Sequence, residues 1–189
     1  MTTLSVTLSN RYLTRIPEWV QDLLLIVSGS LLVALFAQIE IPLMPVPITG
    51  QTFAVLLVGA LMGARRGGAA LSLYLIEGIA GLPFFSGGAS GSTHLFGATG
   101  GYLIGFVVAA FAIGLMAERG LERNFRTSLI PFFVGTIIVY VCGIAWLAVF
   151  LGSFQQAVVL GLLPFLVGDA IKLFAAAIAL PSAWKLMNR

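Results

Sequence analysis

Residues 129–151 read LIPFFVGTIIVYVCGIAWLAVFL, an apolar stretch without a charged side chain. A transmembrane helix needs about 20 consecutive, mostly apolar residues. Similar runs lie near 22–41, 50–64, 67–84, 98–117 and 157–181. The runs are continuously apolar rather than alternating, which argues against a membrane β-barrel. We therefore expect an all-α integral membrane protein with six transmembrane helices.

The composition agrees with lipid as the solvent of this chain. Of its 189 residues, 59% are apolar and 9% are charged, whereas about 25% are charged in an ordinary soluble domain. Six crossings use most of the length. We therefore expect residues 1–189 to form a single membrane domain, in which residues 1–20 are a short cytoplasmic N-terminal segment.

The cations give the expected orientation because they cluster in alternate connections. They precede the first run, separate the second from the third and the fourth from the fifth, and follow the sixth: Arg11, Arg15, Arg65, Arg66, Arg119, Arg123, Arg126, Lys185 and Arg189. The other three connections contain no Lys or Arg. The positive-inside rule places the cationic side, with both termini, in the cytoplasm. The net charge of +3 therefore reflects membrane topology, and we expect no nucleic-acid partner.

Two charged residues lie inside the last run, where Asp169 precedes Lys172 by three positions. This spacing puts both on one helix face. A charge at membrane depth costs several kcal/mol and normally faces the protein interior with a partner. The pair is therefore either an ion pair that fixes the last helix in the bundle or a polar clamp for a small ligand.

Other polar residues allow several interpretations. Glu77 could line a pocket, carry a proton, or be protonated and bonded within the bundle. Thr49 and Gln51 are candidate pocket-rim residues or caps of the second helix. The Gly-rich connection 82–101 is either a lid over an outward-facing pocket or a flexible connector. His94 in that connection is a solvated or rim residue rather than part of a metal site, which would need more ligands.

Enzymatic activity is not expected. Neither Lys172 nor Lys185 follows a glycine, so the chain has no phosphate-binding P-loop, and with a single histidine it has no zinc-protease motif. We expect neither a catalytic residue nor a metal. Small-residue pairs such as Gly59 with Gly63, Gly101 with Gly105, and Ser30 with Ala34 allow close helix packing, within the chain or against a partner subunit.

Four further segments stand out, in this order: Pro45-Val-Pro-Ile-Thr-Gly-Gln-Thr52, Gly81-Leu-Pro-Phe-Phe-Ser-Gly-Gly88, Gly97-Ala-Thr-Gly-Gly-Tyr-Leu-Ile-Gly-Phe106 and Pro164-Phe-Leu-Val-Gly-Asp-Ala-Ile-Lys172. Together they resemble the BioY family of biotin transporters, the substrate-specific S components of energy-coupling factor (ECF) importers. The resemblance covers nearly the whole chain from about residue 24. Ala98 and Val167 stand where the family often has proline.

The resemblance implies a cell-membrane protein that captures extracellular biotin, with biotin as the transported ligand and no cofactor. It implies that Asp169 and Lys172 bind the ligand, with aromatic residues such as Phe84, Phe85 and Tyr102 packed on its rings. The full set of expected substrate-binding residues is Asp169, Lys172, Tyr102, Gln51, Thr49, Ser86, Phe85, Thr99 and Glu77.

The implied partners, besides the lipid bilayer, are a transmembrane coupling subunit and two ATPase subunits. The expected contact face for the coupling subunit is Ser30 with Ala34, and a homo-oligomer remains open. The alternative functions are an S component for another vitamin or a self-sufficient carrier that couples ions through Glu77 or Asp169. A membrane-embedded enzyme or a structural assembly factor is a third class, and it would bind no small molecule tightly.

Overall fold

The computed structural model describes residues 3–4 and 16–187. Five helices in this part of the chain are long and apolar enough to cross a membrane. They are α2 (Glu18–Ala37), α3 (Gln51–Ile79), α5 (Gly100–Ala117), α6 (Phe125–Leu151) and α8 (Leu166–Met187). Arg11, Arg15, Arg189 and most of the expected 1–20 segment lie outside the described residues.

Helix α3 covers most of two of the expected runs, 50–64 and 67–84, and it is broken near the end of the first. Gly63 has φ 81° and ψ 178°, a conformation open to glycine but not to other residues. A Cβ built on Gly67 would lie 3.2 Å from the Cα of Gly59, although residues eight apart are about 12 Å apart along a straight helix. The chain therefore doubles back at Gly63, giving α3 a first and a second arm.

The last expected run, 157–181, forms two helices instead of one. Helix α7 (Phe154–Gly161) ends before Pro164, and α8 begins at Leu166. Proline lacks a backbone N–H and disfavours a helical conformation in the residue before it, which explains the interruption. This break places Asp169 in the first turn of α8.

A small antiparallel strand pair is the one departure from an all-helical chain among the described residues. Strand β1 (Glu40–Ile41) pairs with β2 (Ile48–Thr49), with Glu40 opposite Thr49. The prolines between the strands cannot continue a helix. The remaining short elements are the 3₁₀ turns η1 (Ser86–Gly88) and η2 (Leu121–Arg123) and the helix α4 (Ser92–Leu95).

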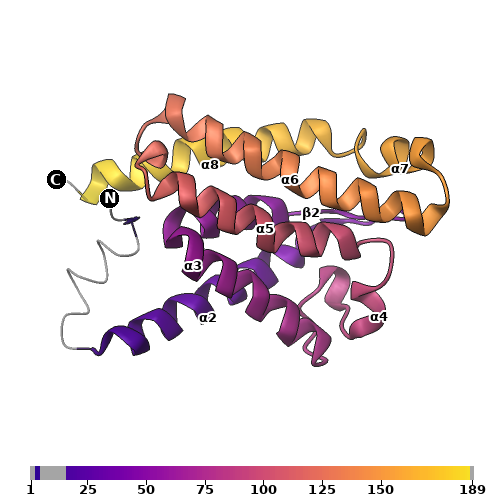
Figure 1. Ribbon diagram of the computed structural model, residues 1–189, viewed down its shortest axis with the longest axis horizontal. Coiled ribbons are helices and arrows are strands. Elements are labelled where there is room, and N and C mark those ends of the chain that lie inside the picture. Colours follow the sequence, from indigo (N-terminus) through magenta and orange to yellow (C-terminus); the bar gives the residue numbers. More distant parts are fainter. Residues whose placement is uncertain (1–2, 5–15, 188–189) are drawn as a thin grey trace.

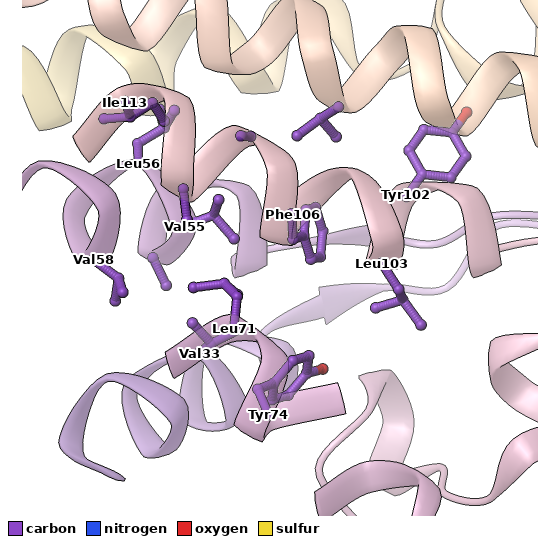
Figure 2. Close-up of a cluster of buried hydrophobic side chains, with 14 of the residues drawn as sticks. Val33, Val55, Leu56, Val58, Leu71, Tyr74, Tyr102, Leu103, Phe106 and Ile113 are labelled. Atoms are coloured by element: carbon purple, nitrogen blue, oxygen red, sulfur yellow. The ribbon is translucent and has the colours of Figure 1, made fainter. Parts of the chain in front are cut away.

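The core lies where α2, both arms of α3 and α5 meet, and Figure 2 shows its buried side chains. Val33 comes from α2, Val55 and Leu71 from the two arms of α3, and Ile113 from α5; all four are fully buried. Gly114 allows a close approach of α5 to α3, because a Cβ there would lie 2.2 Å from the backbone nitrogen of Ala64. Small residues at such contacts are typical of helix packing in lipid.

The outer surface is apolar on the described helices. On α6, the exposed residues include Ile130, Phe133, Ile137 and Val141, whose spacing places them on one face of the helix. A water-facing helix would carry polar residues on this face. The exposed apolar face instead matches a surface that contacts lipid tails.

The two ends of the bundle differ in chemistry. In Figure 1, η2 and the C-terminal end of α8 lie at one end of the molecule, whereas β2, α4 and α7 lie at the other. The described cations other than Lys172 belong to the first end, since they sit at the α3 break, after α5, in η2, at the start of α6 and at the end of α8: Arg65, Arg66, Arg119, Arg123, Arg126 and Lys185. There Arg66 forms a salt bridge with Asp22 of α2. We name this the cationic end.

Candidate functional site

Asp169 is the centre of a polar network at the end opposite the cationic end. Its residue surface is 6% exposed. Its Oδ1 accepts hydrogen bonds from Lys172 Nζ at 2.7 Å and from Thr52 Oγ1 at 2.9 Å, and its Oδ2 accepts one from Tyr140 OH at 2.6 Å. The donors come from α8, α3 and α6. Hydrogen bonds to an ionised group are among the stronger ones in proteins, and these compensate for the burial of the carboxylate.

Lys172 uses its whole donor capacity in this network. Besides Asp169 Oδ1, its Nζ donates to the carbonyl oxygen of Thr49 at 2.7 Å and to Thr52 Oγ1 at 3.0 Å. An ammonium group has three N–H donors. The Asp169–Lys172 ion pair thus joins α8 to strand β2 and to the start of α3.

Gln51 and Thr49 belong to a second set of hydrogen bonds beside the first. Thr49 Oγ1 donates to Gln51 Oε1 at 2.9 Å, and the Gln51 amide nitrogen Nε2 donates to Tyr74 OH at 2.6 Å. Tyr74 OH in turn donates to the carbonyl oxygen of Phe84 at 3.2 Å. These bonds tie the first turn of α3 to its second arm and to the connection that follows it.

These polar groups line a pocket with apolar walls. It holds about 500 Å³ of space between atoms, counting the part that opens to solvent. Its lining residues are Val46, Pro47, Thr49, Gln51, Thr52, Ser86, His94, Thr99, Tyr102, Leu103, Phe106, Val139, Tyr140, Phe165, Asp169 and Lys172. A mostly apolar pocket with a few placed polar groups is typical of a small-molecule site.

Tyr102 forms part of the wall nearest α7. Figure 2 shows its ring extending from α5 toward the helix above it. Its hydroxyl donates to the carbonyl oxygen of Gly161 at 2.7 Å, and its ring centroid lies 6.4 Å from that of Phe165. Because the hydroxyl is engaged by Gly161 of α7, the ring presents an apolar surface to the pocket.

The connection between α3 and α5 contributes Ser86, His94 and Thr99. The His94 ring stacks on Phe85, with centroids 5.0 Å apart and an interplanar angle of 15°. His94 Nε2 lies 3.4 Å from Thr99 Oγ1. Burial lowers the pKa of His94 below its ordinary value, and the negative charge of Glu40 opposes this shift. This connection therefore packs against the bundle and forms one side of the pocket.

Most of the residues proposed from sequence meet at this pocket, but Phe85, Phe84 and Glu77 do not line it. Phe85 is fully buried behind His94, edge-on to Tyr74 at 5.7 Å between ring centroids. Glu77 accepts a hydrogen bond from Ser30 of α2. Of the three interpretations of Glu77, the structure has the carboxyl bonded within the bundle.

The sequence did not single out Thr52, Tyr140 or Phe165. Thr52 ends the first quoted segment, and its bonds to both Asp169 and Lys172 place it at the centre of the network. Tyr140 is one of the few hydroxyl-bearing residues in the apolar run 129–151. A polar side chain in such a run could have indicated a buried hydrogen bond. Phe165 is apolar in an apolar segment and gave no signal.

The expected contact face for a partner is wrong. Ser30 is fully buried and Ala34 is 6% exposed, because this side of α2 packs on α3 and Ser30 bonds to Glu77. The exposed face of α2 carries Leu24, Leu31 and Leu35 instead. Small residues at this spacing serve packing within the chain.

The family model and the relatives described below all belong to one protein family. The model of the BioY family matches residues 3–189. The probable biotin transporter BioY of Pyrococcus horikoshii is 42% identical over 154 residues, which are 78% of this chain and 90% of the relative. The biotin transporter BioY of Thermotoga maritima is 39% identical over 147 residues, 78% of this chain and 86% of the relative.

A solved structure is similar over the same region. The crystal structure of the S component for biotin from an ECF-type ABC transporter superposes with a TM-score of 0.74 at 26% identity. The match covers 89% of this chain and 93% of that chain. The family model spans almost the entire sequence, and the relatives exceed 30% identity over most of its length. This chain therefore belongs to the BioY family.

Proposed function

We propose that this protein binds biotin in the pocket around Asp169 and delivers it into the cell as the substrate-capture subunit of an ECF-type transporter. The observation that carries the proposal is the buried Asp169 carboxylate, which lines an apolar pocket. The names of the relatives and of the similar structure, all biotin proteins, support the choice of ligand.

Asp169 suits the ureido ring of biotin, which carries two N–H donors and one carbonyl acceptor. A carboxylate offers about four lone-pair positions, and three are occupied by Lys172, Thr52 and Tyr140. The free position on Oδ2 accepts from a ureido N–H. Lys172 can donate to the ureido oxygen once it releases one of its three present acceptors.

The walls suit the fused rings of biotin. Tyr102, Phe106 and Phe165 supply aromatic surface from α5 and from the α7–α8 connection, and Val139 supplies aliphatic surface from α6. Burying apolar ligand surface contributes about 25 cal/mol per Å². Gln51, Thr49, Ser86 and Thr99 complete the proposed set of substrate-binding residues at the rim.

The proposed topology has six membrane crossings, because each arm of α3 counts as one. The cationic end faces the cytoplasm, as the positive-inside rule requires, and both chain termini lie on that side. The pocket then opens toward the outside of the cell membrane, where extracellular biotin is available. A pocket at the opposite end from the cations supports this orientation.

The proposed partners are a transmembrane coupling subunit and two ATPase subunits. The chain has no P-loop of its own, which agrees with ATP hydrolysis by another subunit. Its contact surface must use outward-facing residues, unlike Ser30 and Ala34. The exposed leucines of α2, among them Leu31 and Leu35, are available for such a contact.

The test is calorimetry of the detergent-purified chain with biotin, thiamine and riboflavin in parallel. We expect saturable binding of biotin and none of the other two vitamins at the same concentrations. Preferred binding of thiamine or riboflavin would assign the pocket to another vitamin. Absence of binding by all three to a folded chain would refute substrate capture.

A further inference from the structure

His94 is the remaining charge-bearing group of the pocket. Helix α4, which carries it, contacts α3 and α5, whereas α8 with Asp169 and Lys172 contacts α6 and α3. His94 thus reaches the pocket from a different side of the bundle. Its ring is held by Phe85 and lies within hydrogen-bonding range of Thr99.

On the α8 side of the pocket, no positive group in the described part of the chain is free to bind an anionic ligand. Asp169 and Lys172 neutralise each other in a salt bridge of 2.7 Å, and each N–H of Lys172 is already donated. Among the described lining residues, His94 is the only other side chain that becomes positive near neutral pH. A carboxylate would bind more favourably to a positive donor outside this ion pair, and His94 forms no salt bridge among the described residues, although the charge of Glu40 acts on it.

We propose that His94, in its imidazolium form and assisted by the Thr99 hydroxyl, binds the carboxylate at the end of the ligand's tail. The inference rests on the proposed binding of biotin and deepens it. It divides the pocket into two functional sides. The Asp169 side recognises the neutral ureido ring, and the His94 side selects ligands with an acidic tail over neutral ones.

Proton linkage follows from the environment of His94. Burial lowers its pKa, so the imidazole of the ligand-free protein is neutral at neutral pH. A bound carboxylate favours the charged form and raises this pKa. Binding then takes up a proton, so the affinity for the carboxylate rises as the pH falls from the raised pKa of the complex to the lowered pKa of the free protein.

Other titratable groups near His94 act on both acidic and neutral ligands and therefore need a control. The Glu40 carboxylate on β1 raises the pKa of His94 against the effect of burial. The further titratable groups of the lining and of the Phe85 contact are Asp169, Lys172, Tyr102, Tyr140 and Tyr74. A neutral ligand with the same rings reports their effects without contact between a carboxylate and His94.

The experiment compares biotin with biotinamide, whose tail ends in a neutral amide, by calorimetry at about pH 8 and about pH 5.5. The proteins are the full chain, His94→Gln and His94→Lys. For the unchanged chain we expect biotin to be preferred over biotinamide by about tenfold or more at the lower pH, the scale of a charged hydrogen bond, and by much less at the higher pH. In His94→Gln the preference should be small at both pH values.

The lysine variant keeps a positive charge at both pH values, so its preference for biotin should be large and independent of pH. Glu40→Gln should move the preference to lower pH, because it removes the charge that raises the pKa of His94. A pH-dependent preference that survives in His94→Gln would overturn the inference, as would equal affinity for the two ligands in the unchanged chain. Failure of both ligands to bind the unchanged chain would instead refute the proposed function, and the inference with it.

Discussion

Tyr140 and Asp169 are joined by a hydrogen bond of 2.6 Å between the phenol hydroxyl and Oδ2. Tyr140 lies in the middle of α6 and Asp169 in the first turn of α8. The bond fixes the orientation of the carboxylate, because the other oxygen is held by Lys172 and Thr52. The oxygen that Tyr140 binds is also the one with a free acceptor position for ligand.

Asp169→Asn should weaken biotin binding by about 1–3 kcal/mol, the usual scale for loss of a buried hydrogen bond to a charged group. The amide cannot accept at both positions, and Lys172 loses its counter-ion. The affinity of the detergent-purified variant is measured by calorimetry. Glu77→Gln is the matched control, because it makes the same chemical change to a carboxyl outside the pocket. Unaltered affinity in a folded Asp169→Asn protein would contradict the assigned role.

Tyr140→Phe should reduce biotin affinity by about 0.5–1.5 kcal/mol, since the variant removes one hydrogen bond and keeps the ring. If Tyr140 acts by orienting Asp169, the same change should have little effect in the Asp169→Asn background. A double-mutant cycle measured by calorimetry gives this coupling. Equal losses in the two backgrounds would mean that Tyr140 acts on the ligand independently of Asp169.

Gly114→Ala should destabilise the protein by about 1–3 kcal/mol or more, as expected for an overpacked helix contact. The new Cβ would lie 2.2 Å from the Ala64 nitrogen, where backbone must move. Thermal unfolding in detergent measures the change. Gly168→Ala is the control: nothing lies within 4 Å of its Cβ, and alanine is favoured over glycine in a helix by about 1 kcal/mol. Similar stability of the two variants would argue against the tight contact at Gly114.

Cysteine labelling tests the proposed orientation. In a Cys142→Ser background, Ser92→Cys near the pocket should react with a membrane-impermeant maleimide on intact cells, whereas Arg119→Cys at the cationic end should react only after lysis. Both positions are exposed, so accessibility within the protein does not separate them. Labelling of Arg119→Cys on intact cells would reverse the topology inferred from the positive-inside rule.

Much of the fold was predictable because lipid permits few backbone solutions. The runs at 98–117 and 129–151 correspond closely to α5 and α6. The interruption after α7 was signalled only by Pro164, which suits the first turn of a helix and lies two residues before the start of α8. The sharpness of the turn at Gly63 could not be predicted, because it depends on contacts with α5 that lie far along the sequence.

The site was predictable in part for a different physical reason. Asp169 and Lys172 stand out because charge is costly in lipid. Tyr140 and Phe165 resemble packing residues, and only the fold brings them to the pocket. Glu77 stands out by the same charge argument as Asp169, yet its partner is Ser30. A charged residue in a membrane segment indicates a buried polar contact, because charge is costly in lipid. The sequence alone does not say whether that contact is with the ligand or with the protein.

The partners of the Asp169–Lys172 pair all precede it in the chain: Thr49, Thr52 and Tyr140. Helix α8 therefore carries an acid and a base whose described partners all belong to earlier segments of the chain. The groups that accept and donate to these charges are translated before it. During biosynthesis we therefore expect the earlier segments to favour the register of α8 in which its two charges are paired.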